Sequence, residues 1–289
     1  MYQKNLKNVF LLFISALLFC LFSACTPQTK ETKEIGLQLW SVREDMKIDP
    51  VATIKAVGEM GYKFVEMASY DDGKMYGMDP IEFKVLCEEN GLSVLSSHTG
   101  SNVPDSTEWD ETMAWWDQCI DAHIAVGAKY IVKPGMGNDA FGSLEVLKKY
   151  CDYYNAVGAK CNEKGLRFGY HNHAREFTTE FEGKPLYDWM LENTDPDKVM
   201  FQLDLYWIIE GGKDPVDYFN KYPGRFELWH IKDVAEVGAS GEIDFSRIYS
   251  AKEVSGMKYG IVEVEEYNFT PLESVKVSLD FLNGAEFVK

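Results

Sequence analysis

Four of the five histidines lie near the ends of short hydrophobic runs, where an apolar side chain would be the usual choice. They are His98, His171, His173 and His230, whereas His123 lies in the middle of a predicted helix. Burying a polar group in place of an apolar one costs free energy. Four histidines in equivalent positions therefore indicate a ligand, a metal ion or a catalytic role.

Other polar residues occur late in the same runs, and most of them share one parity along the predicted strand. Because side chains alternate in direction along a strand, residues two apart face the same side. The residues with this pattern are Gln38 and Trp40, Glu66, Gln202 and Asp204, His230 and Lys232, and Glu263 and Glu265.

Imidazole and carboxylate side chains together suit a divalent cation such as Zn²⁺, Mn²⁺ or Co²⁺. We predict one such ion, held by one residue from each of the last four strands. The predicted ligands are His171, Asp204, His230 and Glu263, with His173 as the alternative to His171 because both have the same parity.

The elements that must position these residues follow one repeated pattern from Ile35 onward. Short apolar runs alternate with longer amphipathic stretches. The runs are IGLQLW from Ile35, KFVEMA from Lys63, LSVLSSH from Leu92, KYIVKPG from Lys129, LRFGYHNH from Leu166, KVMFQLDLYW from Lys198, FELWHIKD from Phe226 and YGIVEVEEY from Tyr259. Eight such units predict an α/β fold, a (β/α)8 TIM barrel with its chemistry at the C-terminal strand ends. A doubly wound open sheet is the alternative, but no GxGxxG follows the first run.

The stretches between the first runs read as helices with recognisable ends. We expect helices over residues 50–60, 80–90, 107–126 and 143–164, and a glycine follows each of them. The first two begin with a proline, which is favoured in the first helical turn, and a following glycine permits a left-handed cap.

The charge of the chain excludes one class of partner. The 289 residues include 46 acidic and 29 basic side chains, for a net charge of −17. A field of that sign repels nucleic-acid phosphates and argues, more weakly, against a phosphorylated substrate. The loop after the last strand, EEYNFTP from Glu265, is also anionic. We therefore expect no nucleic acid as a partner.

Several phrases resemble a known family. They are GLQLWSVR from Gly36, YHNH from Tyr170, QLDLYW from Gln202, WHIKD from Trp229 and VEVEEY from Val262. In order and spacing they resemble the sugar phosphate isomerase/epimerase group of the xylose isomerase-like TIM barrels. The resemblance covers residues 35–289 and implies a divalent metal held by residues of strands five to eight.

The resemblance also shows one departure. In epimerases of this group the metal ligands are Glu, Asp, His and Glu. Asp204, His230 and Glu263 match the last three, whereas His171 stands at or next to the position of the first glutamate. Both glutamates also transfer protons in those epimerases, so a two-carboxylate proton swap does not carry over unchanged.

The chemistry that the resemblance implies is proton abstraction next to a carbonyl. A metal that binds a sugar carbonyl and its neighbouring hydroxyl acidifies the C–H bond between them. Glu263, His173 and Glu265 are the candidate bases. The predicted enzyme is a sugar isomerase or epimerase for an unphosphorylated sugar or keto-sugar. A lyase or hydratase acting on keto-sugars or glycosides is the alternative, because the same enediolate can expel a leaving group.

Five further residues are candidates for orienting the substrate: Gln38, Trp40, Glu66, His98 and Lys232.

Two other functions are alternatives to a sugar isomerase or lyase. A non-enzymatic glycan-binding lipoprotein would keep the barrel without the chemistry, and tight sugar binding without metal would reveal it. An endonuclease IV-like nuclease needs more histidine ligands and a basic surface, and five histidines with a charge of −17 disfavour it.

The N-terminal segment predicts export. Lys4 and Lys7 precede an apolar run over residues 9–22, which is shorter than the roughly 20 residues of a membrane span. Small residues then precede Cys25, as in a bacterial lipobox. We expect residues 1–24 to be a lipoprotein signal peptide.

The rest of the chain is then divided in two. Residues 25–34 are a flexible tether and residues 35–289 a single barrel domain. Lipidation of Cys25 would place the domain in the bacterial cell envelope, on its periplasmic or surface side. The remaining cysteines, Cys87, Cys119, Cys151 and Cys161, lie in predicted helices and are expected to be buried free thiols.

A substitution at Cys25 tests this localisation. In Cys25→Ala the thiol that would carry the lipid is missing, so the protein should leave the membrane fraction while the domain still folds. Fractionation of cells that express either form, with circular dichroism of the soluble protein, measures both properties. Unchanged membrane association would contradict the lipid anchor.

Overall fold

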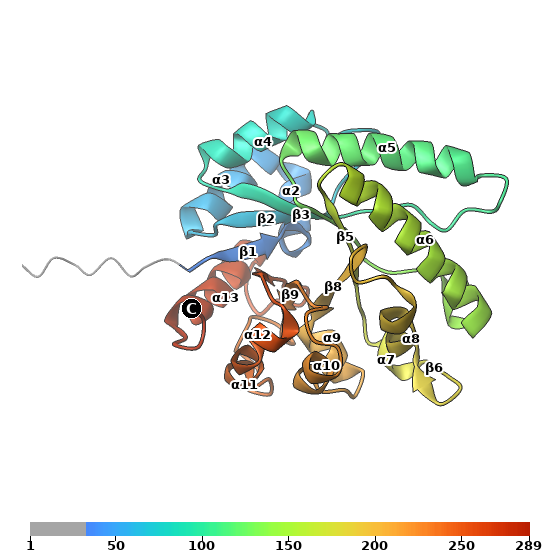
Figure 1. The fold of residues 1–289 in the computed structure, drawn as a ribbon. Helices are drawn as coiled ribbons and strands as arrows, with labels where there is room; N and C mark the ends of the chain where they lie inside the picture. Colours follow the sequence, from blue (N-terminus) through green and yellow to red (C-terminus); the bar gives the residue numbers. More distant parts are fainter. Residues whose placement is uncertain (1–32) are drawn as a thin grey trace, which may run out of the picture. The chain divides into compact units, whose positions relative to one another are not determined.

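The computed structural model describes residues 33–289. Eight parallel strands close into a barrel in the order β1-β10-β9-β8-β5-β4-β3-β2, and Figure 1 shows the helices arranged around them. The strands are β1 (Ile35–Gln38), β2 (Phe64–Met67), β3 (Ser93–His98), β4 (Tyr130–Lys133), β5 (Arg167–His171), β8 (Val199–Asp204), β9 (Leu228–Ile231) and β10 (Tyr259–Val262). Each strand lies within one of the predicted runs, so the TIM barrel prediction is confirmed.

The helices between the first strands also match the sequence pattern. The four predicted helices correspond within two residues to α3 (Pro50–Met60), α4 (Pro80–Glu89), α5 (Trp109–Val126) and α6 (Leu144–Glu163). Gly61 and Gly127 adopt the left-handed conformation directly after α3 and α5. The glycine signal therefore worked because the backbone turns there in a way that disfavours other residues.

Further elements follow the later strands. Later helices of the outer layer are α8 (Leu186–Asn193), α10 (Pro215–Lys221), α11 (Phe245–Ser250), α12 (Lys252–Ser255) and α13 (Pro271–Gly284). Shorter elements, which the sequence pattern did not predict, follow the C-terminal ends of four strands. They are η1 (Leu39–Val42) and α2 (Arg43–Ile48) after β1, η2 (Asn138–Phe141) after β4, α7 (Arg175–Thr178) with the hairpin β6 (Glu180–Phe181) and β7 (Lys184–Pro185) after β5, and α9 (Leu205–Glu210) after β8. Of these, η1 places Trp40 beside the site cavity, and α9 is capped by Asp204.

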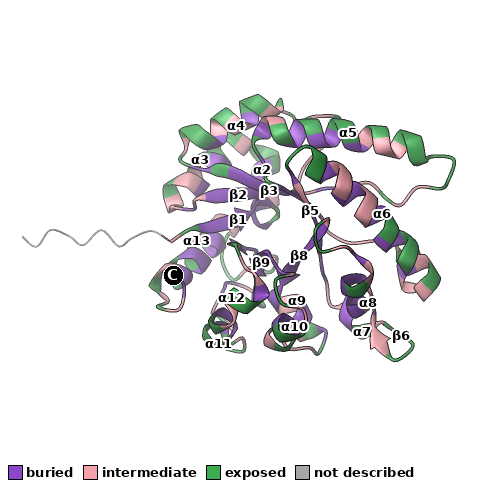
Figure 2. Ribbon diagram, in the orientation of Figure 1, coloured by how far each residue is buried: buried purple, intermediate pink, exposed green. Residues whose placement is uncertain are grey.

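Burial divides the barrel into layers, and in Figure 2 the buried residues follow the strands and the inner faces of the helices. The interior of the barrel is filled by a separate apolar cluster: Phe64, Leu95, Tyr130, Val132, Met200, Leu228 and Ile261. Gly36 and Gly169 make room for it, because a Cβ at either position would collide with Phe64 or Met200. A packed floor therefore closes the barrel beneath the polar strand ends.

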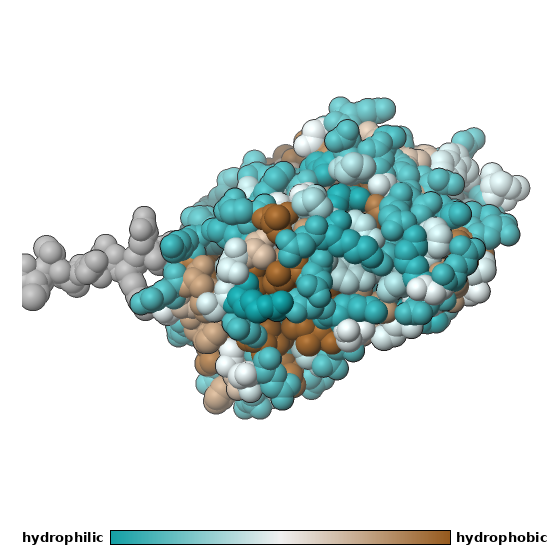
Figure 3. Space-filling view, turned by 60° about the horizontal axis from the view of Figure 1, so that its bottom comes forward, coloured by the Kyte–Doolittle hydropathy of each residue, from teal (hydrophilic) through white to brown (hydrophobic). Residues whose placement is uncertain are grey.

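The four cysteines that the structure describes are buried and free, as predicted. Among residues 33–289 no helix is long and apolar enough to cross a membrane. The face in Figure 3 is largely hydrophilic, and its apolar side chains gather toward the centre and lower part of the view. The predicted signal peptide, Cys25 and most of the tether lie outside the described residues.

Candidate active site

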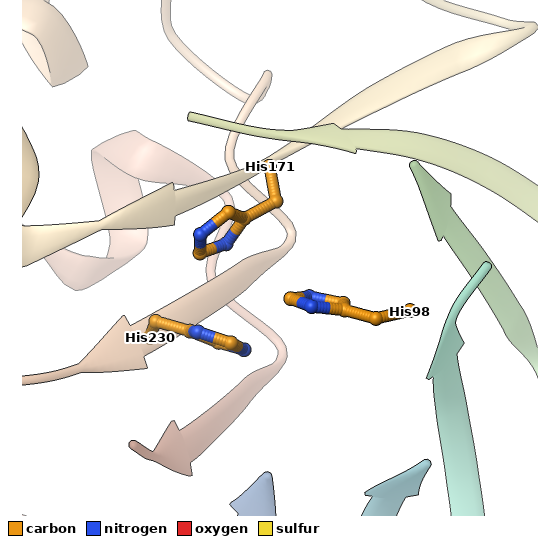
Figure 4. A group of neighbouring side chains, drawn as sticks. All are labelled: His98, His171 and His230. Carbon is orange, nitrogen blue, oxygen red and sulfur yellow. The ribbon is translucent and has the colours of Figure 1, made fainter. Parts of the chain in front are cut away.

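The C-terminal ends of the strands bring the predicted site residues together. His98 ends β3, His171 ends β5 and His230 lies in β9, and Figure 4 shows their three rings pointing toward one another. The ring of His230 lies 4.6 Å from that of His171 and 5.0 Å from that of His98, centroid to centroid. Residues that are up to 132 positions apart in the chain thus share one end of the barrel because parallel strands all point the same way.

The predicted ligand set forms a tight group. Donor atoms of His171, Asp204, His230 and Glu263 all lie within 4.8 Å of one another, and all four residues are buried. Asp204 and His230 are direct partners in the pairing of β8 with β9. His98, His171 and His230 form a second such group. His173 belongs to neither group, so the structure favours His171 over His173 as a ligand.

Asp204 divides its two carboxylate oxygens between two tasks. Its Oδ1 accepts hydrogen bonds from the backbone N–H groups of Tyr206 (2.9 Å) and Trp207 (2.8 Å), which caps α9. Its Oδ2 is buried and has no hydrogen-bond partner in the described part of the chain. That oxygen lies 3.9 Å from Nδ1 of His230. An unpaired buried carboxylate oxygen is costly, and a bound cation would satisfy it.

Glu66 is the centre of a buried hydrogen-bond network. Its carboxylate accepts from Gln38 Nε2 (2.7 Å), Ser96 Oγ (2.6 Å) and Gln202 Nε2 (2.8 Å), and it lies 2.6 Å from Nε2 of His230. A register shift between Val65 and Glu66 brings Glu66 opposite Ser96 in the neighbouring strand. Such irregularities redirect side chains next to active sites.

This network contains two of the predicted substrate residues. Glu66 and Gln38 are fully buried, and neither is among the residues that line the site cavity. In the structure Gln38 donates to Glu66 and Glu66 lies beside His230, while their roles toward the substrate stay predictions. The hydrogen bond of His230 Nε2 with Glu66 leaves Nδ1 facing Glu263 Oε2 at 3.2 Å. A histidine that is oriented by a carboxylate on its other nitrogen is typical of metal ligands.

The charges of the group are strongly coupled. Burial lowers the pKa of His230, but the Glu263 and Glu66 carboxylates outweigh burial and raise it to about 10. Burial raises the pKa of Glu263, yet His230 and Lys232 hold it well below its usual range. Without a metal, His230 is therefore an imidazolium between two carboxylates.

The other two ligands are neutral or nearly so without metal. Burial, and then the nearby His230, lowers the pKa of His171 well below its usual value. Burial raises the pKa of Asp204 to about 7, with Glu263 adding to burial and Lys232 opposing it. The group therefore holds protons that a cation could replace.

A cavity of about 290 Å³ opens above these residues. Its wall has imidazoles from His98, His171 and His173 and carboxylates from Glu263 and Glu265. Trp40, Ala68 and Pro134 complete the lining. Two predicted bases, His173 and Glu265, thus border the space beside the ligand group, together with the predicted substrate residues Trp40 and His98.

Lys232 lies behind this wall. It is buried, its ammonium donates to Glu263 Oε2 (3.2 Å) and to Glu265 Oε2, and it stands 4.9 Å from the ring centre of Trp207. Lys232 does not line the cavity. Its ammonium is a counter-charge to both glutamates, and its contact with substrate stays a prediction.

Two residues with clear roles in the site were not assigned one from the sequence. Gln202 Oε1 lies 2.7 Å from Nε2 of His98 and 3.0 Å from Nδ1 of His171, while its Nε2 donates to Glu66. Ser96 donates to the same carboxylate. Each lies two residues before a site residue of its strand, so the inward parity was a usable signal for both.

Comparison with known proteins agrees with this geometry. The profile described as xylose isomerase-like TIM barrel matches residues 54–284. The chain belongs to the xylose isomerase-like TIM barrel family. The family-level resemblance of the sequence is therefore confirmed.

Individual relatives narrow the comparison. A crystal structure of a sugar phosphate isomerase/epimerase from Parabacteroides distasonis is 33% identical, with a TM-score of 0.83, and covers 89% of this chain and all of that one. Inosose dehydratase of Lacticaseibacillus casei is 26% identical over 82% of this chain and 90% of its own length. D-allulose 3-epimerase from Methylomonas, in complex with D-allulose, shares the fold at 13% identity and a TM-score of 0.67, over 87% of this chain and 96% of its own. The named relatives are thus carbohydrate-modifying enzymes of the isomerase and lyase classes.

Proposed function

We propose that this protein is a metal-dependent enzyme that removes a proton next to the carbonyl of an unphosphorylated sugar or keto-sugar. The observation that supports this most is the buried group of His171, Asp204, His230 and Glu263 beside a cavity bordered by further imidazoles and carboxylates. Isomerisation or epimerisation is the first outcome to test, as the name of the similar structure from Parabacteroides distasonis suggests.

The donor set fits one divalent cation such as Zn²⁺, Mn²⁺ or Co²⁺. Two imidazoles and two carboxylates are ligands that these ions accept, and the unpaired Oδ2 of Asp204 becomes an anionic donor when the cation displaces the proton of this carboxyl. When bound, the cation would act as a Lewis acid that polarises the substrate carbonyl. His98 lies within reach of two of the imidazoles, but its Nε2 is already close to Gln202 and Glu66. We therefore assign His98 to substrate binding and not to the metal.

The side chains on the cavity wall can move the proton. Burial lowers the pKa of His173, so its imidazole is neutral and can accept a proton. Glu265 stands in the same cavity and receives a hydrogen bond from Lys232. We assign general acid/base work to His173, Glu265 and Glu263, in positions that border the same substrate space.

The cavity wall also bears on the substrate class. Neither lysine nor arginine occurs among its lining residues, whereas two glutamates do. A phosphate group would meet the carboxylates of Glu263 and Glu265, and Lys232 is already paired with both of them, which disfavours a further anion here. The proposal is therefore an unphosphorylated sugar, and it agrees with the proposed location of this protein in the bacterial envelope.

Elimination is the second candidate outcome, and one observation favours it. Imidazoles of His98, His171 and His173 and carboxylates of Glu263 and Glu265 border the same cavity, so groups of two chemical kinds face the substrate space. An epimerase that returns the proton to the opposite face uses two matched bases, whereas an elimination uses a base and a different group as the acid. The dehydratase relatives are consistent with this use of the site.

Incubation in D₂O with a sugar and keto-sugar panel tests the proposal. The soluble domain, loaded in turn with Zn²⁺, Mn²⁺ or Co²⁺, should place deuterium on the carbon next to the carbonyl of at least one substrate, as seen by NMR and mass spectrometry. An isomeric product marks an isomerase or epimerase, and loss of water or of an aglycone marks a lyase. No exchange with any metal and sugar, together with sugar binding by metal-free protein, would replace the proposal by a glycan-binding function.

A further inference from the structure

A second cavity adjoins the one above the ligand group. It has a volume of about 500 Å³ and shares Trp40 and Ala68 with the first cavity. Its walls come from η1 and α2 on one side and from the loop over residues 68–77 on the other. The two cavities are therefore neighbouring parts of one binding region, and the second alone lies in the size range of small-ligand sites.

Trp40 lies where the two cavities meet, and Arg43 contacts both its ring and its backbone. Trp40 is 42% exposed although its neighbours Leu39 and Ser41 are buried. The guanidinium of Arg43 lies 5.0 Å from the Trp40 ring centre and donates to the Trp40 carbonyl (3.1 Å) and to the hydroxyl of Tyr267 (2.8 Å). An exposed aromatic ring that is fixed in this way is a suitable platform for the apolar face of a sugar ring.

The loop over residues 68–77, which forms the opposite wall, is held in a defined conformation by its own contacts. Asp72 and Tyr76 are two of the three described non-glycine residues with positive φ, at 45° and 50°. Tyr76 packs on Phe83 with its ring centre 5.4 Å away, and its hydroxyl accepts from the N–H of Ala68 at 2.8 Å. Backbone strain of this kind persists where the surroundings fix it, often at ligand sites.

The lining of the second cavity combines apolar and polar groups. Met46 and Leu39 are buried beneath it, while Lys47, Lys74 and Asp71 stand exposed at its walls. Apolar surface below and several hydrogen-bonding side chains around it suit a polyhydroxylated ring. They contrast with the first cavity, where titratable groups predominate.

We infer that the second cavity binds a second sugar unit. The substrate is then a disaccharide or longer glycoside: its reacting ring occupies the cavity at the ligand group, and its neighbouring ring lies against Trp40. This inference rests on the proposed function, because the first cavity must hold the reacting ring. It adds that the enzyme acts on a unit within, or at the end of, a larger carbohydrate.

A blocking variant tests the second cavity alone. Ser69 lines only that cavity, so Ser69→Trp should fill it without touching the ligand group. Ser246→Trp, at an exposed position on α11, is the matched control. Binding of glucose, maltose, cellobiose and trehalose to metal-loaded protein is measured by titration calorimetry and saturation-transfer NMR, with metal content determined on the same samples.

The wild type and the control should bind at least one disaccharide about tenfold or more tightly than glucose, which corresponds to roughly 1.4 kcal/mol. Ser69→Trp should lose that preference and keep its glucose affinity and metal content. Equal or absent binding of all disaccharides by the wild type overturns the inference, as does an unchanged preference in folded Ser69→Trp. Absence of metal or of deuterium exchange would instead count against the proposed function, so the two failures are distinguishable.

Discussion

Purified His230→Ala and Asp204→Asn are each expected to lose more than about a hundredfold in affinity for a divalent cation. Residues that only orient a ligand cost about 10 to 100-fold when removed, so loss of a ligand should cost more. His230 presents Nδ1 to Glu263 and Asp204 from the centre of the group. Removing either donor leaves three, and neither vacancy can be filled by His173, which stands outside the group.

Both variants should remain folded, which makes the result interpretable. Asp204→Asn keeps an Oδ1 that can cap α9 and exchanges the unpaired Oδ2 for an amide nitrogen that cannot bind a cation. His230→Ala leaves Glu66 with donors from Gln38, Ser96 and Gln202. Metal content by elemental analysis, metal titration and circular dichroism of each variant provide the measurements.

Two comparison variants show which group of residues holds the metal. His98→Ala should keep the metal but lose turnover, because we assign His98 to the substrate. Glu66→Gln should keep the fold and lose about 10 to 100-fold in metal affinity, because it only orients His230. Loss of metal from His98→Ala would point to the three-histidine group instead. A full metal complement in both His230→Ala and Asp204→Asn would show that the proposed set of metal ligands is wrong.

Much of this arrangement could be predicted from the sequence because a parallel barrel makes position simple to infer. All eight strands run the same way, so a residue late in any strand must lie at the same end of the barrel. Alternation then separates inward from outward residues, as the pairing of Asp204 with His230 illustrates. Two rules were thus sufficient to bring together residues from the fifth to the eighth strands.

The role of each site residue depends on how deeply its side chain is buried below the cavity. The alternation of side chains along a strand does not predict that depth. Glu66 and His98 both face inward near strand ends, yet Glu66 is fully buried and His98 lines the cavity. Lys232 has the inward parity of His230 but lies behind Glu263 and Glu265. The short elements η1 and α2, which form the second cavity, are too brief to show a helical period in the sequence.

Metal binding should be strongly pH-dependent, and the coupled charges of the group give its form. The raised pKa of His230, about 10, means that a proton occupies the imidazole below that pH. It must leave before Nδ1 can bind a cation, because Nε2 remains hydrogen-bonded to Glu66. Asp204, whose burial raises its pKa to about 7, carries a second proton at lower pH. His171 and Glu263 need lose none, because their pKa values are both well below their usual ranges.

The apparent affinity for Mn²⁺ or Co²⁺ should therefore rise about tenfold per pH unit between pH 7.5 and 8.5, and more steeply, toward a hundredfold per unit, below about pH 6.5. Calorimetry in buffers of different ionisation enthalpy counts the protons directly: about one released per metal at pH 8 and about two near pH 6. In Asp204→Asn the second proton should disappear while the first remains. A pH-independent affinity above pH 7 would mean that metal binding displaces no proton from His230. His230 would then not be a metal ligand.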